Sequence, residues 1–178
     1  MIYMFLADGF EETEAVAALD MMRRGGLEVC TVGIENRSVT GSHGITVVAD
    51  MVGNELGGEI PEGVILPGGM PGTINLETSE IVTDLLKKTY ENGGLVAAIC
   101  AAPSVLGHLG FLNGKKAVCY PGFESELHGA EIGSGKTATD GNIITACGAG
   151  AAIEFGLDIV RYFAGFDEAE RVRKSILL

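Results

Sequence analysis

The sequence predicts an α/β protein whose mainly parallel sheet is covered by helices on both faces. Short apolar runs of strand length, such as Leu95–Ile99, alternate with longer segments of helical periodicity, such as Glu11–Arg24. Parallel strands need crossover helices, and this alternation is typical of such crossovers. The length of 178 residues suffices for one core, and 27 glycines with only 6% aromatic residues favour tight turns around an aliphatic interior. We therefore expect a single domain over residues 1–178.

In the first half of the chain, apolar runs and turn residues delimit each expected element. Gly25-Gly26 ends the first helix, Gly41-Ser42-His43-Gly44 forms a hairpin turn, and Pro67-Gly68-Gly69 closes a short buried strand. The expected elements are, in order, strand Ile2–Ala7, helix Glu11–Arg24, strand Leu27–Val32, a hairpin of Ser38–Thr40 with Ile45–Val48, and strand Val64–Leu66.

The second half continues the alternation without an internal repeat or a linker. Ser79 is the expected N-cap of its helix. The expected elements are helix Ser79–Tyr90, strand Leu95–Ile99, helix Ala101–Leu109, strands Lys116–Cys119 and Ile143–Thr145, and helices Ile153–Phe163 and Glu168–Leu177. Ligands of parallel sheets bind beyond the carboxyl ends of the strands. The turns after Ala7, Leu66 and Ile99 are therefore expected to form the site.

Composition argues against several classes of function. The net charge of −12, from 24 acidic and 12 basic residues, leaves no basic surface for nucleic acid. No apolar run reaches the roughly 20 residues of a membrane span, and the segment Met1–Ala7 lacks the basic start of a signal peptide. The four cysteines are scattered without a C-x-x-C pair, which disfavours a thiolate metal cluster. Free thiols fit a reducing compartment, so we expect a cytoplasmic location.

Cys100 carries the clearest chemical signal of the chain. The apolar run Leu95–Ile99 ends at it, and a helical segment follows at once. Ala98 and Ala102, two residues before and after it, are small, which is the spacing of a nucleophile elbow. A side chain at such a turn lies near a helix N-terminus, where the helix dipole favours a thiolate. We interpret Cys100 as a reactive thiol rather than as a small core residue.

Glu14 is the expected carboxyl partner of that thiol. On a helical projection it falls on the apolar side, among Phe10, Ala17, Ala18 and Met21. A carboxyl there is costly unless it is protonated or hydrogen-bonded, and a raised pKa would let it act as an acid or base. Glu11 and Glu12 are interpreted as acids that complement the helix dipole. For Glu14, an acid that only complements the helix dipole stays open as the alternative.

Backbone donors and rim residues complete the candidate site. Gly68 and Gly69 follow a strand, so their amides can approach a substrate oxygen as in an oxyanion hole, although an ordinary glycine turn is an equal alternative. The amide of Ala101 is the second expected donor. Cys119 and Tyr120 end a strand and either reach the same rim or pack in the core.

The three histidines fit a Cys-His mechanism poorly. His108 lies eight residues past Cys100, which is about two helical turns away. His43 lies in the hairpin turn and His128 in a glycine-rich loop, so each is interpreted as a surface residue that could still fold over the site. The rim candidates are therefore Gly68, Tyr120 and His43.

Several segments together resemble the ThiJ/PfpI superfamily, from Ile2 to about Phe163. The likeness is closest to the branch of bacterial ThiJ/YajL-type proteins and the human parkinsonism-associated protein deglycase (DJ-one). It is carried by Gly9-Phe10-Glu11-Glu12-Thr13-Glu14-Ala15, Leu66-Pro67-Gly68-Gly69, Ala97-Ala98-Ile99-Cys100-Ala101-Ala102-Pro103, and Gly148-Ala149-Gly150 leading into Glu154-Phe155-Gly156-Leu157.

The resemblance implies a flavodoxin-like three-layer sandwich, usually a homodimer. It implies that Cys100 is the reactive, oxidisable cysteine, that Glu14 is its carboxyl partner, and that Gly69 and Ala101 occupy the backbone-donor positions. Peptidase-like members carry His directly after the cysteine, where this chain has Ala101, so proteolysis is not expected. Human-like members place a His where this chain has Tyr120.

Two functions follow as hypotheses. The first is a glyoxalase- or deglycase-type enzyme acting on methylglyoxal or its early protein and thiol adducts, in carbonyl and oxidative stress defence. It would need no metal and no organic cofactor. The alternative is a non-enzymatic redox-sensing protein or chaperone, in which Glu14 stabilises an oxidised Cys100.

Overall fold

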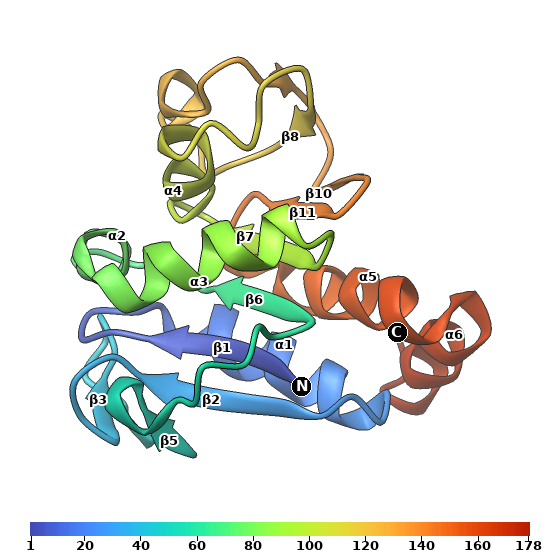
Figure 1. Cartoon of the computed structure of the whole chain (residues 1–178). Coiled ribbons are helices and arrows are strands. Elements are labelled where there is room, and N and C mark those ends of the chain that lie inside the picture. Colours follow the sequence, from blue (N-terminus) through green and yellow to red (C-terminus); the bar gives the residue numbers. More distant parts are fainter.

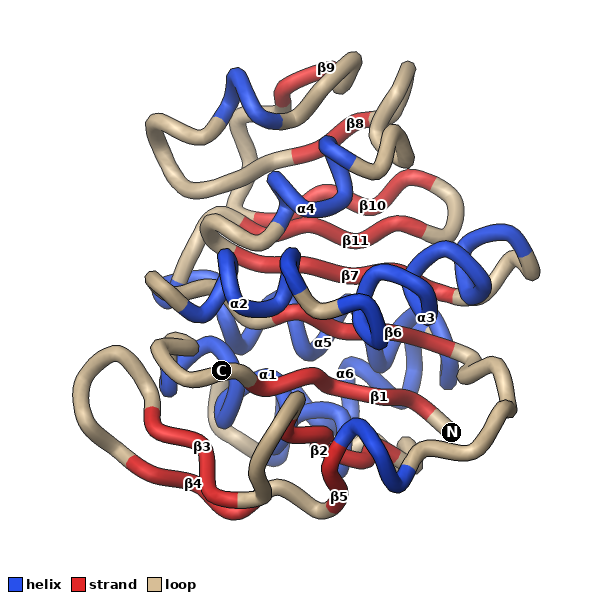
Figure 2. Tube along the Cα trace, turned by 60° about the vertical axis from the view of Figure 1, so that its left-hand side comes forward, coloured by secondary structure: helices blue, strands red, loops and turns tan.

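A computed structural model describes all 178 residues as a three-layer α/β sandwich (Figure 1). Its seven-stranded sheet has the order β10-β11-β7-β6-β1-β2-β5, and Figure 2 shows these strands side by side. Neighbouring strands are parallel except for the antiparallel pair β10 and β11. The strands are β1 Ile2–Leu6, β2 Val29–Gly33, β5 Met51–Val52, β6 Gly63–Leu66, β7 Leu95–Ile99, β10 Thr137–Asp140 and β11 Ile143–Ala146. The predicted fold class is confirmed.

Helices cover both faces of the sheet and divide the interior into two cores (Figure 1). The helices are α1 Glu12–Arg24, α2 Gly72–Thr78, α3 Glu80–Glu91, α4 Pro103–His108, α5 Ala152–Ala164 and α6 Phe166–Ser175. Alternate side chains of β1 point to opposite faces: Met4 packs in the core with α1 and α5, whereas Phe5 packs in the core with α3 and α4. No helix is both long and apolar enough to cross a bilayer.

Smaller elements account for most differences from the predicted boundaries. The predicted hairpin is present, with β3 Ser38–Thr40 paired to β4 Thr46–Val48. A second small sheet pairs β8 Lys116–Ala117 with β9 Glu131–Ile132, and three 3-10 turns cover Gly53–Glu55, Glu124–Glu126 and Ala149–Ala151. Helix α2 and strands β5, β9 and β10 were not predicted, because segments of two to seven residues carry too little periodicity to reveal their type.

Two predicted boundaries are wrong for local reasons, whereas Ser79 is the N-cap residue of α3 as predicted, although its side chain makes no capping hydrogen bond. Strand β8 ends at Ala117, where the next amide, that of Val118, donates to the Thr145 hydroxyl of β11 instead of to a backbone carbonyl. The helix after Cys100 begins at Pro103 rather than at Ala101, with the proline in the first turn, where a missing N–H is tolerated.

The chain order places a topological switch at β1. From β1 the chain proceeds to β2 and β5 on one side, then crosses to β6 and β7 on the other side. The loops that follow β1 and β6 therefore leave the same edge of the sheet in opposite directions, which is where ligands bind in such sheets.

Close packing of α1 against α5 holds the first helix in place. A Cβ atom on Gly156 of α5 would lie 2.7 Å from the Met21 Cβ and 3.0 Å from the Ala18 Cα of α1. Only glycine permits this approach. The helix that carries Glu14 is thus fixed relative to the sheet.

Candidate active site

Cys100 occupies a strained turn between β7 and α4. Its φ is +66°, in the left-handed region that non-glycine residues rarely adopt. Its backbone is held on both sides, because its N–H donates to the Ala146 carbonyl at 2.9 Å and its carbonyl accepts from the Tyr120 N–H at 2.8 Å. The ends of neighbouring segments therefore fix the direction of the half-buried thiol, which is the geometry of a nucleophile elbow.

Glu14 reaches this thiol from the first turn of α1. Its side chain is 1% exposed, and its Oε2 accepts the Gly68 N–H at 2.9 Å. The carboxyl also shares a hydrogen bond with the Cys100 thiol. The Glu11 carboxylate caps the helix by accepting the Glu14 N–H at 2.6 Å. Glu14, which helical phase places on the apolar side of α1, thus lies beside Cys100, as predicted from the sequence.

Both glycines after β6 are required by close contacts. A Cβ on Gly68 would lie 2.6 Å from the Cys100 Cβ and 2.7 Å from the Glu14 Oε2. Gly69 has φ +90°, and a Cβ there would lie 2.5 Å from the Glu11 nitrogen. These contacts explain why both positions are glycine. The Gly68 N–H already donates to Glu14, and the role of the Gly69 amide as an oxyanion donor stays a prediction.

Burial controls the protonation of both partners. Burial raises the pKa of Glu14 to about 7, and the Glu11 charge adds to this, whereas hydrogen bonds from Cys100 and Gly68 act in the opposite direction. Burial also raises the pKa of the Cys100 thiol, and the adjacent Glu14 carboxylate raises it further, to about 12. The backbone N–H groups of Ala101 and Gly69 hydrogen-bond to the sulfur and lower its pKa in part.

The expectation of a thiolate held by a helix dipole is therefore not supported. Helix α4 has only six residues and starts three positions after Cys100, so its dipole is small at the sulfur. Instead, Cys100 and Glu14 form a coupled pair that holds one proton between pH values of about 7 and about 12. When Glu14 holds that proton, the charge that opposes the thiolate is gone and a carboxyl O–H is available to the sulfur.

Tyr120 and Gly148 line the other side of the carboxyl. A Cβ on Gly148 would lie 3.3 Å from the Tyr120 ring and 4.0 Å from the Glu14 Oε1. Tyr120 is 51% exposed, so its ring forms part of the rim rather than of the core. Sequence reasoning assigned no role to Gly148. Its position between a ring and a carboxyl depends on contacts that no local pattern reports.

His43, the third rim candidate, serves a different carboxylate. Its Nδ1 lies 2.8 Å from the Glu12 Oε2, and its backbone N–H donates to the Glu12 Oε1 at 2.7 Å. Burial acts to raise the pKa of Glu12, but hydrogen bonds from His43 and Ile45 outweigh it and lower that pKa to about 2. Glu12 lies in the first turn of α1, as expected of an acid that complements the helix dipole, but it is also buried and anchors the hairpin turn.

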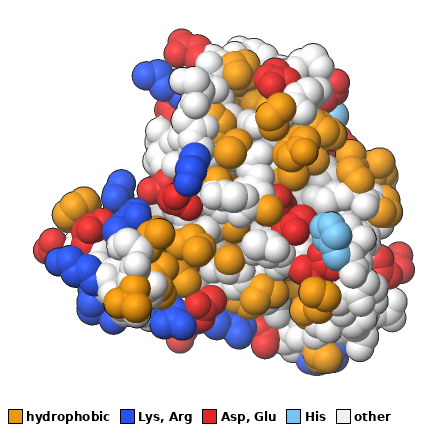
Figure 3. All heavy atoms as spheres, turned by 180° about the vertical axis from the view of Figure 1, so that it is seen from behind, with side chains coloured by type: hydrophobic (Ala, Val, Ile, Leu, Met, Phe, Trp, Pro, Cys, Tyr) orange, Lys and Arg blue, Asp and Glu red, His pale blue; other side chains and the backbone are white.

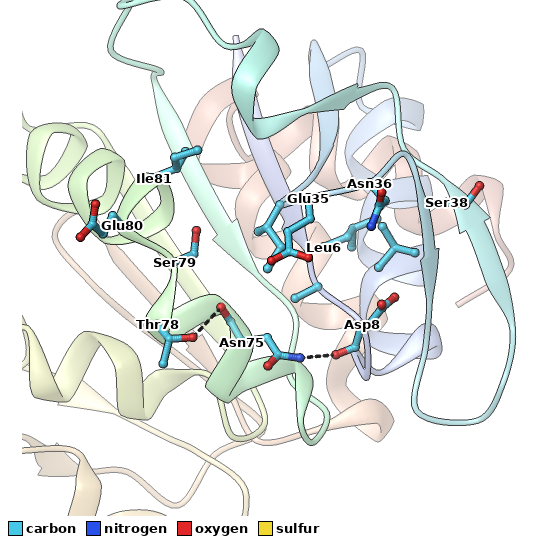
Figure 4. A pocket seen from close by; sticks show the side chains of 13 residues that line it. Leu6, Asp8, Glu35, Asn36, Ser38, Asn75, Thr78, Ser79, Glu80 and Ile81 are labelled. Carbon is cyan, nitrogen blue, oxygen red and sulfur yellow. Dashed lines mark hydrogen bonds between the residues drawn. The ribbon is translucent and has the colours of Figure 1, made fainter.

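A cavity of about 530 Å³ lies beside the carboxyl end of β1, apart from Cys100 and Glu14 (Figure 4). It opens between the ends of β1 and β2 and the junction of α2 with α3, where the Asn75 amide donates to the Asp8 carbonyl at 2.8 Å. Cys100 and Glu14 do not line it. The pair of Cys100 and Glu14 therefore lies outside this cavity.

Comparisons with known proteins agree with this architecture. The model of the DJ-1/PfpI family matches residues 1–162. Protein dj-1beta of Drosophila melanogaster is 35% identical over 176 residues, which cover 97% of this chain and 94% of that protein. The solved structure of oxidized Toxoplasma gondii DJ-1 superposes with a TM-score of 0.95 at 34% identity, covering 99% of this chain and 97% of that one.

Two further relatives differ in length and in name. Protein DJ-1 homolog A of Arabidopsis thaliana is 36% identical over 177 residues, and this chain spans only 45% of it, although 97% of the chain is covered. The glutathione-independent glyoxalase DJR-1.2 of Caenorhabditis elegans is 29% identical over 170 residues, covering 94% of this chain and 90% of that protein. The family model matches most of this chain, and a 35% identical relative matches nearly all of it. The chain therefore belongs to the DJ-1/PfpI family.

Proposed function

We propose that this chain is a cysteine-dependent glyoxalase or deglycase that acts on methylglyoxal or its early protein and thiol adducts. The observation that carries the proposal is the approach of the buried Glu14 carboxyl to the Cys100 thiol at a strained turn, with the backbone N–H groups of Gly69 and Ala101 beside the sulfur. The glyoxalase name of the Caenorhabditis elegans relative supports the same chemistry. We further propose a role in carbonyl and oxidative stress defence in the cytoplasm.

The first step forms a covalent adduct. Glu14 accepts the thiol proton while the Cys100 sulfur bonds to the aldehyde carbon, and the carbonyl electron pair moves onto oxygen. The amides of Gly69 and Ala101 stabilise this oxyanion, because preorganised N–H donors act strongly at a water-poor site. Glu14 then returns the proton to the oxygen, which gives a neutral hemithioacetal.

The second stage moves a hydrogen between adjacent carbons. Glu14 removes the proton from the former aldehyde carbon, giving an enediolate, and delivers a proton to the neighbouring carbon while the hydroxyl proton moves between the two oxygens. The product is a thioester of lactate on Cys100. Water then hydrolyses the thioester, so methylglyoxal and one water give lactate and one proton. A pKa of about 7 suits Glu14 to both directions of transfer at neutral pH.

The decisive experiment measures lactate formed from methylglyoxal without added thiol. We expect Cys100→Ser to lower turnover at least ~100-fold, as loss of a covalent nucleophile does. Cys30→Ser is the matched control, because Cys30 is another half-buried free cysteine on a different strand. Undiminished lactate formation by Cys100→Ser would reject the mechanism.

A redox-sensing protein or chaperone is the second candidate. The same groups that would hold an oxyanion, the amides of Gly69 and Ala101 and the Glu14 carboxyl, would also hydrogen-bond a Cys100 sulfinate. This candidate predicts selective oxidation of Cys100 by mild peroxide, and equal oxidation of all four cysteines contradicts it. In Glu14→Gln, lost turnover favours the enzyme, whereas loss of sulfinate protection alone favours the sensor.

A further inference from the structure

A second cluster of polar side chains lies at the end of α4, away from the Cys100 pair. His108, Glu126 and His128 place one ligand atom each within 4.8 Å of one another. The His108 Nε2 lies 3.0 Å from the Glu126 Oε2, and the two imidazole rings are 5.1 Å apart between centroids. Two imidazoles and a carboxylate whose ligand atoms lie this close together are a donor set that suits divalent transition metals.

A glycine in α4 permits the cluster. A Cβ on Gly107 would lie 2.1 Å from the Glu126 carbonyl oxygen and 3.0 Å from the His128 nitrogen, so any other residue would push this segment away. Between the two ligands, Leu127 is 3% exposed and anchors the segment in the core. Glu126 and His128 are thus held against the end of α4 by backbone packing.

Glu77 at the end of α2 orients the central imidazole. Its Oε1 lies 2.5 Å from the His108 Nδ1, which directs the opposite ring nitrogen, Nε2, toward Glu126. Histidines that bind metals commonly donate their second ring N–H to a carboxylate, because this fixes the tautomer and the ring orientation. The cluster therefore contains an orienting carboxylate in addition to three ligands.

We propose that His108 Nε2, the Glu126 carboxylate and the His128 imidazole bind one Zn²⁺ or a similar divalent transition ion, with the fourth position open to water. Ligand atoms at tetrahedral Zn²⁺ lie roughly 3.3 Å apart, given bonds of about 2.0–2.1 Å, so the 3.0 Å pair is already placed and His128 needs only a small side-chain adjustment. A bound ion ties the segment after Cys100 to the segment after Tyr120.

The second histidine-containing cluster, Glu11 with Glu12 and His43, lacks these features. It has a single imidazole, and the Glu12 Oε1 already accepts backbone N–H groups of His43 and Ile45. A metal would have to displace those hydrogen bonds. His43 therefore serves as the internal control for binding at His108 and His128.

The test is a titration of the full chain with Zn²⁺, followed by NMR of the imidazole signals. We expect one equivalent to shift the signals of His108 and His128 and to leave His43 unchanged. In competition with a chromophoric chelator, His128→Ala and Glu126→Gln should each weaken binding at least ~10-fold, and Glu77→Gln should weaken it about 10- to 100-fold. His43→Ala should retain wild-type affinity.

Two results would overturn the site. The first is no shift of the His108 and His128 signals with excess Zn²⁺ in the wild-type chain, a readout that needs no variant to fold. The second is tight binding of one equivalent that survives both His128→Ala and Glu126→Gln, which would place the ion elsewhere, for example at thiols. Neither result bears on turnover of methylglyoxal, so the proposed function is tested separately.

Discussion

At the residue scale, the buried carboxyl of Glu14 and the thiol of Cys100 titrate as a coupled pair. The two groups are buried together, so ionising both at once would place two negative charges in contact. The strained backbone of Cys100 and the absence of side chains at Gly68 and Gly69 keep them within hydrogen-bonding distance. In the proposed mechanism, the carboxyl controls when the sulfur acts as a nucleophile.

Glu14→Gln should lower the pKa of the Cys100 thiol while reducing turnover. The substitution removes the carboxylate charge that raises this pKa and leaves the amides of Gly69 and Ala101 in place. The midpoint of alkylation against pH should move to lower pH for Cys100, with the midpoint for Cys30 unchanged as a reference. Lactate formation should fall about 10²- to 10⁴-fold, as for loss of a general acid or base. An unchanged Cys100 midpoint would contradict the shared proton.

Glu14 also couples stability to pH. Its pKa is raised from 4.5 to about 7 on folding, so the folded chain keeps a proton that the unfolded chain releases. The free energy of unfolding from this group is therefore largest below pH 4.5 and falls by up to about 3 kcal/mol as the pH rises to 7. Glu14→Gln should remove this slope, and urea denaturation at several pH values measures it. A persistent slope in the variant would assign it to other groups.

At the element scale, the loops after β1 and β6 interlock through glycine contacts. The Glu11 N–H donates to the Gly68 carbonyl at 2.9 Å, and the Gly72 N–H donates to the Gly9 carbonyl at 3.2 Å. A Cβ on Gly9 would lie 2.4 Å from the Pro71 ring. The start of α1 and the amide of Gly69 are thus positioned by the same contacts, so a change in one loop moves both halves of the site.

Gly69→Ala should destabilise the fold and reduce turnover. Its φ of +90° and the 2.5 Å approach of its Cβ to the Glu11 nitrogen combine backbone strain with a clash, and we expect a loss of about 2–4 kcal/mol. Gly110→Ala is the control, because Gly110 has φ +78° but nothing within 4 Å of its Cβ, and should cost only about 1 kcal/mol. Equal losses in urea denaturation would show that packing between the loops contributes little.

At the scale of the whole molecule, the proposed homodimer would need an exposed apolar surface. Hydrophobic side chains lie exposed among acidic ones on the face seen from behind (Figure 3). Val16 on α1 is half-exposed, and Ile45 and Val48 of the hairpin are also exposed. A net charge of −12 opposes non-specific aggregation, so apolar contact between two copies is the association we propose.

Light scattering should therefore report a mass about twice the 18.5 kDa of one chain. Val16→Asp should shift the population toward the monomer, because it places a charge among apolar side chains. Ile81→Asp on α3, which covers the opposite face of the sheet, is the control and should leave the mass unchanged. A wild-type mass near 18.5 kDa would contradict the homodimer.

The local sequence by itself determined the order of the major elements and the position of the strand-to-helix turn at Cys100. The run Leu95–Ile99 is a strand with those bounds in the structure, and helical phase alone placed Glu14 on the apolar side. These features depend on the spacing of neighbouring residues, which a sequence shows directly. The burial of Glu12 does not follow from neighbouring residues, because it depends on a hairpin turn 31 residues away in the chain.

Only the tertiary structure decided which distant groups meet. It raised the pKa of Cys100 by burying the thiol beside a carboxylate, where local reasoning from a helix terminus expected the opposite. It also brought Glu77, His108, Glu126 and His128 to one point from three separate segments. Such contacts arise because packing joins residues that are far apart in the chain, and no local periodicity encodes that distance.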